Sequence, residues 1–432
     1  MIANLCRTPD SFADGVYRDG AGARAMALGG ASVGSPDEPL EAMYSNPAGL
    51  AFAKDARLQL GAIGGVLGGN FSNSSNPKIN LHDGSGALPE AAYVLPLKPG
   101  SLSLGLGFIP EAFAAPDWQF VDKPGGLGGS TSYGQQRNYS AFLAARASAG
   151  LSWKITDTLA LGADLGAEYN RNELVTPYTF QNSPALKGFK TLLNLRTDGW
   201  GVNGTVGLVW HAVENLSLGL SYRSTTFFDT EGDASGNAGL QLQALGAGAF
   251  RPDFHYDAEV ATRLPQMVSA GFSWQARDWL RIVGETDWIN WSGAFDHLDI
   301  KLKNGNNADI NGFLASNHIQ DVVPLNWKDA FVYRLGLEFA LSDEYTARLG
   351  YTFGANPVPS STITPMSAAI LEHSLASGLE WRRGRYTIAG AYQYSFPATS
   401  HVDTSSLASG EYSNSTTTLQ AHWFGVTLGV GF

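Results

Sequence analysis

The chain has 432 residues, of which 51 are glycine and 16% are charged, whereas an average soluble protein has about 7% glycine and about 25% charged residues. Lys and Arg number 28 against 39 Asp and Glu, a net charge of −11, which excludes nucleic acid as a partner because phosphates attract a basic surface. No segment reaches the roughly 18 apolar residues of a membrane-spanning helix. The mean hydropathy of −0.09 is compatible with the alternating strands of a membrane barrel.

The first 55 residues differ from the rest of the chain. Residues 21–32 are rich in Gly and Ala without alternation, and Asp37, Glu38 and Glu41 follow. On composition alone this segment fits equally a plug inside a barrel or a tail outside it. Cys6 is the only cysteine, so we expect no disulfide and no Cys-based metal site. The residues before Cys6 form neither a lipobox nor a signal peptide.

From about residue 57 to the C-terminus, apolar residues alternate with polar or small ones. In residues 159–169 the odd positions are apolar, and residues 424–432 place five apolar side chains on one face. These runs span about 10 to 15 residues, whereas strands of soluble proteins average about 5–6. Long strands with one apolar and one polar face predict an all-β protein, a transmembrane β-barrel with bilayer outside and a wet lumen inside.

Short and long connections alternate along these strands. Short turns at one rim and long loops at the other are typical of outer-membrane barrels. Six turns join twelve strands, and the first and last strands bring the predicted number to fourteen, an even number as a closed bacterial barrel requires. The turns lie at 98–100, 156–158, 213–215, 276–278, 342–344 and 383–384, and the long segments near 67–87, 110–135, 172–197, 230–260, 292–326, 355–372 and 398–416.

Ten tryptophans fall near predicted strand ends, where an aromatic girdle meets the lipid headgroups. The alternative, a soluble sandwich with a Trp-rich core, requires shorter strands and fewer long loops. The ten are Trp153, Trp200, Trp210, Trp274, Trp279, Trp288, Trp291, Trp327, Trp381 and Trp423.

The predicted third strand, residues 101–110, contains Gly105 and Gly107 and meets Pro110. Proline removes a ladder donor and glycine permits a bulge, so strand pairing is expected to fail near these residues. The alternative is that Pro110 merely ends the strand.

The loops at 172–197 and 230–260 are unusually apolar for exposed segments. The apolar residues of the first loop fall at helical spacing on one face. Exposed apolar patches mark binding or membrane contact, although the two loops could simply pack on each other as a lid. The residues are Leu186, Phe189, Leu192 and Leu193 in the first loop and Leu240, Leu242, Leu245 and Phe250 in the second.

Alternation places charged residues of both signs on the lumen side. One or two cations could hold a carboxylate, but charges away from water need partners. We therefore expect most of them to pair with each other or with the N-terminal segment. They are Arg146, Asp164, Glu168, Arg223, Arg281, Glu285, Asp287, Arg334, Glu338, Arg348 and Glu380.

Several motifs occur in a consistent order. Residues 22–31 read GARAMALGGA, and residues 45–50 read SNPAGL, which contains Asn46, Pro47 and Ala48. Further motifs are DGWGVNG at 198–204, LGLSYRS at 218–224, LPQM at 264–267, DWINWS at 287–292, WKDA at 327–330, RLGY at 348–351 and PVP at 357–359. With these, the sequence resembles the FadL-type outer-membrane transporters of long-chain fatty acids, which include relatives that take up aromatic hydrocarbons.

The resemblance implies a 14-stranded antiparallel transmembrane β-barrel in the bacterial outer membrane, with a hatch at residues 1–55 inside the barrel at 56–432. Hydrophobic molecules would be captured by the two apolar loops, pass to a pocket beside the hatch and leave sideways near Gly105, Gly107 and Pro110. We expect Asn46, Pro47 and Ala48 to face that gap, with Asn46 reaching the freed backbone groups. The expected partners are a fatty acid, alkane or aromatic molecule and the surrounding lipid and lipopolysaccharide, for a monomer without cofactor or metal.

Two departures from the family pattern matter. No N-terminal aromatic residue aligns securely, and residues 364–371 are apolar where typical members carry charges, which suggests a less polar substrate than a fatty acid. No Gly-x-Ser-x-Gly or His-Glu-x-x-His motif and no phosphate loop occurs, so we expect no enzyme. The alternative function is an accessory or scaffold barrel of a larger machine that transports nothing.

Overall fold

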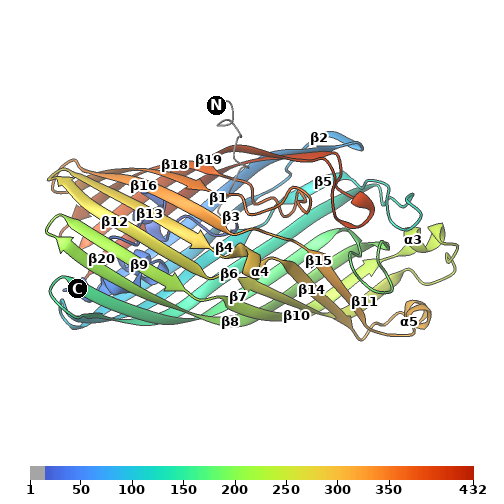
Figure 1. Cartoon of the computed structure of the whole chain (residues 1–432), viewed down its shortest axis with the longest axis horizontal. Coiled ribbons are helices and arrows are strands. Elements are labelled where there is room, and N and C mark those ends of the chain that lie inside the picture. Colours follow the sequence, from blue (N-terminus) through green and yellow to red (C-terminus); the bar gives the residue numbers. More distant parts are fainter. Residues whose placement is uncertain (1–14) are drawn as a thin grey trace, which may run out of the picture.

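The computed structural model describes residues 15–432, and the predictions on residues 1–14, including Cys6, lie outside that part. One antiparallel sheet closes on itself because β1 (Arg57–Asn73) pairs with β20 (Ser415–Gly431), from Arg57 opposite Gly431 to Ser72 opposite Thr416. The result is a long barrel of tilted strands (Figure 1). Among the described residues, no helix has the length and apolarity to cross a membrane.

The wall has fourteen strands, which confirms the predicted number. Ten are continuous and four are each divided into two segments by a short interruption. The continuous ones are β1, β3 (Ser85–Lys98), β4 (Leu102–Ala114), β6 (Gln135–Lys154), β7 (Leu159–Thr179), β8 (Lys190–Val213), β17 (Tyr345–Gly354), β18 (His373–Arg383), β19 (Tyr386–Val402) and β20. The divided ones are β9 (Leu216–Arg223) with β10 (Thr226–Asn237), β11 (Asp253–Leu264) with β12 (Met267–Arg277), β13 (Leu280–Ile289) with β14 (His297–Lys303), and β15 (Ile319–Pro324) with β16 (Ala330–Ala340).

Shorter elements decorate the rim with the long connections. The strands β2 (Asn76–Asn80) and β5 (Asp117–Val121) extend the sheet there by pairing with β1 and β6. The loops carry α3 (Gly239–Ala244), α5 (Ala308–Leu314) and the 3₁₀ turn η2 (Ala408–Gly410), whereas α4 (Trp291–Ala294) lies in the interruption between β13 and β14.

All six tight turns lie at strand connections as predicted, but the long loops at 172–197 and 230–260 do not exist at that length. β7 runs to Thr179 and β8 starts at Lys190, while β10 runs to Asn237 and β11 starts at Asp253. The strands continue beyond the apolar band because the backbone ladder persists there, although exposed positions such as Arg196, Glu231 and Asp233 are charged. In the sequence, the point at which a strand passes from lipid into water therefore looked like the end of the strand.

The outer surface carries a broad band of exposed apolar side chains, including Leu165, Val202 and Val426. Trp153, Trp200, Trp210, Trp274 and Trp279 are also exposed, as a girdle requires. The girdle prediction is wrong for Trp291 and Trp327, which are buried, and for Trp423, whose ring packs against the N-terminal segment. A ring near a strand end can face either side of the wall, and alternation alone did not decide the side.

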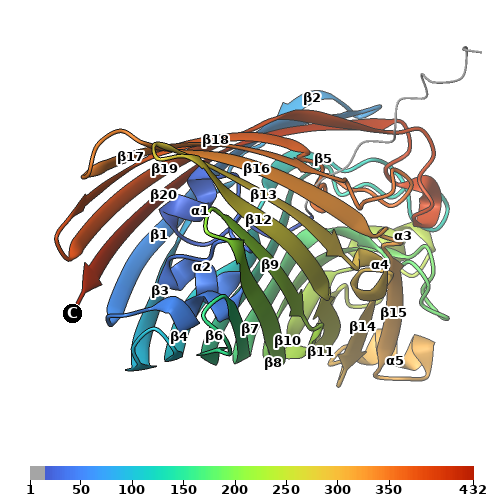
Figure 2. The ribbon, with the colours of Figure 1, turned by 60° about the vertical axis from the view of Figure 1, so that its left-hand side comes forward.

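Residues 15–56, which we call the hatch, lie within the barrel and carry α1 (Gly22–Ala27), α2 (Pro39–Tyr44) and the 3₁₀ helix η1 (Pro47–Phe52). Figure 2 shows these helices enclosed by the wall. Wall glycines bring the two backbones together. A Cβ on Gly162, Gly219 or Gly350 would lie closer than 3.0 Å to backbone atoms of the hatch. The high glycine content thus permits a hatch seated directly on the strands.

Candidate functional site

The wall has a window between β3 and β4. These strands pair only from Lys98 opposite Leu102 to Ala91 opposite Phe108. Beyond that point residues 85–90 pair only with β1, and residues 109–114 pair only with β6 among the wall strands. Pairing across the gap resumes where Asp83 bridges Asp117. The opening between residues 84–90 and 109–116 is therefore bounded at both ends, and it extends about 20 Å along β3.

The predicted gate residues occupy different places relative to this window. Gly105 and Gly107 lie inside the paired region, opposite Val94 and Ala92. Unlike proline, glycine has a backbone N–H, so it can still donate a hydrogen bond to the neighbouring strand. Pro110 lacks a donor and lies on the edge of the window, next to a bulge in the β4–β6 pairing. Both glycines instead make room for the hatch, since a Cβ on either would contact Met43.

The hatch supplies partners for the backbone of β4 at the window. Tyr17 bridges Ala112, and the Arg18 amide donates to the Glu111 carbonyl at 3.2 Å. The Arg18 guanidinium donates to the Pro110 carbonyl at 3.3 Å and pairs with Glu90 of β3 at 2.7 Å. Arg18 therefore joins β3 and β4 at the point where they separate.

The prediction that Asn46, Pro47 and Ala48 face the gap is wrong. The Asn46 amide donates to the carbonyls of Val33 and Leu208, each at 3.0 Å. Ser152 donates to the Ala48 carbonyl at 2.9 Å. The tripeptide thus seats η1 against β6, β7 and β8, away from the window, and Asn46 caps η1 by accepting from the Ala48 amide at 3.2 Å.

An apolar cavity of about 400 Å³ lies above the hatch and reaches the window. Residues 84–86 and 113–116, from the two sides of the window, line it. The apolar segment noted in the sequence forms another side, through residues 365–369 and Leu371. Six aromatic rings complete the lining: Tyr17, Phe113, Phe142, Phe295, Trp327 and Trp423.

The cavity offers little to a carboxylate. Among the described residues that line it, Arg18 is the only basic one, and it pairs with Glu90. Three acidic residues also line the cavity, of which Asp19 pairs with Arg334 and Glu173 with Arg171. A carboxylate in this space would meet no free cation, because the basic lining residue is already paired.

A larger hollow of about 740 Å³ opens beneath the hatch at the rim with the tight turns. Charged side chains line it, among them Asp37, Glu38, Arg281 and Arg382. This mixed, polar lining suits water rather than a hydrophobic molecule. We therefore take the smaller apolar cavity as the site.

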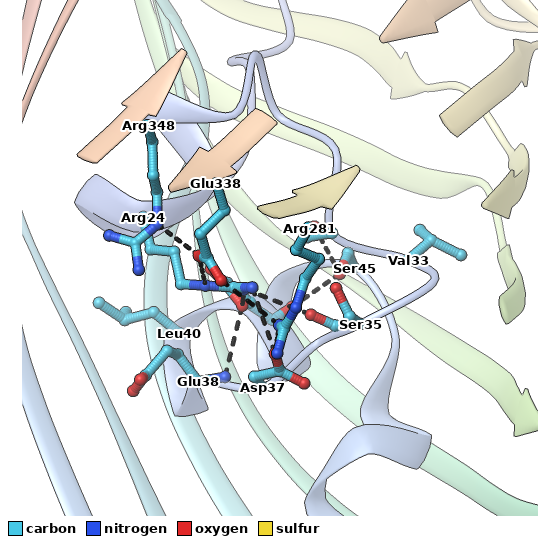
Figure 3. A network of polar contacts seen from close by, with 12 residues as sticks. Arg24, Val33, Ser35, Asp37, Glu38, Leu40, Ser45, Arg281, Glu338 and Arg348 are labelled. Atoms are coloured by element: carbon cyan, nitrogen blue, oxygen red, sulfur yellow. Dashed lines mark hydrogen bonds and ion pairs between the residues drawn. The ribbon is translucent and has the colours of Figure 1, made fainter. Parts of the chain in front are cut away.

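Ion pairs hold the hatch against the wall, which confirms the prediction that most lumen charges are paired (Figure 3). Buried Arg24 pairs with Glu41 at 2.6 Å and with Glu338 of β16 at 3.2 Å. Glu338 also pairs with Arg348 of β17 at 2.6 Å. Further pairs are Arg146–Asp164, Arg334–Asp287 and Arg348–Glu380 within the predicted set, and Arg223 with Glu111, which was not predicted.

The predicted groove residues separate into two groups. Leu186, Phe189, Leu193 and Leu242 are buried in one apolar cluster between the extended strands, with Phe250 packed against it. Leu240 and Leu245, on or beside α3, are exposed, and Leu192 is half-buried. The helical spacing at 186–193 is misleading, because these residues form a turn followed by the start of β8.

A buried lysine connects three segments at the rim with the long connections. Lys190, at the start of β8, pairs with Asp122 and, at 3.1 Å, with Glu411. Asp122 follows β5 and Glu411 belongs to the loop between β19 and β20. Burial raises the pKa of both carboxyls, and the Lys190 charge partly offsets that rise.

Replacing Lys190 with methionine is expected to loosen these segments at neutral pH, by about 3–5 kcal/mol, the usual cost of removing one partner of a buried ion pair. Because the pKa of Asp122 and of Glu411 is already raised, protonation on acidification removes their uncompensated charge. The defect should therefore shrink from pH 7 to pH 5, measured as protease cleavage of the loops. A defect independent of pH would contradict this explanation.

Of three comparisons with known proteins, two found matches: a family model and solved structures of the same fold. The model of a family described as outer membrane protein transport protein (OMPP1/FadL/TodX) matches residues 16–432. A Pseudomonas aeruginosa FadL homologue has a similar structure, with TM-score 0.76, 16% identity and coverage of 97% of this chain and 100% of that one. Structures of the toluene transporters TbuX of Ralstonia pickettii and TodX of P. putida each give TM-score 0.74, 18% identity and coverage of 96% and 99%. Curated protein sequences give no match.

Proposed function

This chain belongs to the OMPP1/FadL/TodX family of outer membrane transport proteins, and on that premise we propose that it admits uncharged hydrophobic molecules and releases them sideways through the window. The main support for this proposal is that residues on both sides of the window line the apolar cavity. A molecule that passes from the cavity directly into the bilayer does not expose its apolar surface to water, which would cost roughly 25 cal/mol for each Å² exposed.

Capture would begin at the extracellular rim. The exposed side chains of Leu240 and Leu245 offer a first apolar contact for a molecule that crosses the lipopolysaccharide. The molecule then enters the ring-lined cavity above the hatch and leaves between β3 and β4. We propose that one chain suffices for this route, because the cavity and the window belong to the same barrel.

The proposed substrate class is an uncharged hydrocarbon, aromatic or aliphatic, rather than a fatty acid. A cavity of about 150 Å³ holds benzene, so about 400 Å³ accommodates a substituted ring or a short chain. The lack of a free cation among the described lining residues supports this choice. The toluene transporters among the structural neighbours are compatible with it.

The test is uptake of radiolabelled toluene, octane and octanoate by cells with and without the protein. We expect faster accumulation of the two hydrocarbons and little change for octanoate. Preferential uptake of octanoate would contradict the substrate class, and no effect on any of the three would favour the accessory-barrel alternative. Purification of a second, tightly bound chain would support that alternative further.

A further inference from the structure

Two aromatic rings meet across the inner side of the window. Phe113 of β4 and Trp423 of β20 lie edge to face, with centroids 5.4 Å apart and planes at 81°. Their strands are not neighbours, because β1 and β3 lie between them. The pair therefore spans two intervening strands on the lumen side.

Glycines make this span possible. Trp423 lies opposite Gly65 of β1, and Gly65 lies opposite Gly86 of β3. A Cβ on Gly65 would lie closer than 3.0 Å to the Trp423 ring, so the indole lies directly on that strand. A Cβ on Gly86 would meet no atom within 4 Å. The indole thus lies on Gly65 and reaches toward Phe113, while the space at Gly86 stays open.

The two rings differ in their support. Trp423 packs on the α1 cluster that contains Ala23, Met26 and Ala27, which anchors it to the hatch. Phe113 belongs to residues 109–114, which have lost β3 as a partner. Both rings line the cavity, so a molecule that moves toward the window meets their contact.

We propose that the contact between Phe113 and Trp423 is the inner gate of the window and limits the size of the molecules that leave. This inference rests on the proposed function. Trp423 is the fixed part of the gate, and Phe113 is the part that moves aside. The gate acts by obstruction, so its loss should favour bulky molecules more than small ones.

The test compares uptake of toluene with that of a bulkier hydrocarbon such as biphenyl in F113A, W423F and a control, F108A. Phe108 lies on the same strand but its side chain is exposed on the outer surface. We expect F113A to raise the biphenyl-to-toluene uptake ratio about three- to tenfold, the factor that corresponds to one edge-to-face pair. W423F, which keeps a ring at the fixed position, should change the ratio less, and F108A should leave it unchanged.

A variant with leucine at Gly86, which is expected to close the exit, separates the two claims. If G86L blocks uptake while F113A leaves the ratio unchanged or lowers uptake of both compounds, the gate is wrong and the lateral route stands. If G86L takes up both compounds normally at equal surface level, the lateral route fails and the gate fails with it.

Discussion

Replacing Gly86 with leucine is expected to reduce uptake of hydrophobic molecules about 10- to 100-fold without unfolding the barrel. Gly86 lines the cavity at the unpaired edge of β3. A Cβ there has no atom within 4 Å, so the start of the new side chain meets open space, and the rest projects into the path of the cargo. A cargo molecule that passes the added side chain meets crowding of the kind that costs about 1–3 kcal/mol in packed cores, and a barrier of that size corresponds to this reduction in rate.

The matched control is Gly390→Leu on β19. A Cβ on Gly390 also meets no atom within 4 Å, and its alternation with buried Ala389 and Ala391 places it on the outer face. Heat-dependent migration in gels reports whether each barrel is folded. Equal uptake by G86L and G390L at equal surface level would refute the lateral route.

Gly105 and Gly107 are poor positions for this test. A Cβ on Gly105 would lie closer than 3.0 Å to the side chains of Leu50 and Met43. A bulky residue there would disturb the hatch before it obstructed the exit. Loss of uptake in such a variant would therefore not distinguish a blocked window from a displaced hatch.

The double variant Gly162→Val, Gly350→Val is expected to unseat the hatch and turn the barrel into an open pore. Each added side chain would collide with hatch backbone, which cannot rotate away as a flexible side chain can. The two positions lie on β7 and β17 and contact different parts of the hatch, at Ala48 and at Gly29. At about 1–3 kcal/mol for each site, the double variant should weaken the seat enough to expose the lumen to water.

Two measurements report this change: single-channel conductance in planar bilayers and sensitivity of cells to a large hydrophilic antibiotic. Both should rise well above wild type in the double variant, whereas Gly390→Val should leave them unchanged. A folded double variant with wild-type conductance would mean that the hatch does not depend on these glycines.

The sequence predicted what depends on short-range pattern. Turns such as 98–100 and 156–158 were found because polar turn residues interrupt a period of two, and the strand number followed from the turns. The same pattern failed at 230–237 and 253–260, where strands continue with charged outward residues. Alternation records the solvent on each face, and beyond the lipid both faces are polar or mixed.

The site depends on contacts between distant residues. Arg18 joins Glu90 and Pro110, yet nothing in its local sequence marks it. The prediction for Asn46 named the wrong part of the wall. Its partners, the carbonyls of Val33 and Leu208, are determined only by how the hatch docks in the barrel. Pro110 did carry a local signal, a missing donor, and it lies on the edge of the window. Gly65 and Gly86 can be recognised as neighbouring positions without side chains only once the strand register is known.

The docking of the hatch on wall glycines also bears on how the chain is assembled. The Ala23 amide donates to Thr427, 404 residues later, and other hatch residues touch β7, β9 and β17. Contacts this distant in sequence form slowly, because the entropy of closing a long loop is lost before the contacts can stabilise the chain. The earliest-synthesised part of the described chain therefore has to wait, unpaired, for the last strand. We expect wall and hatch to mature in one late, cooperative step.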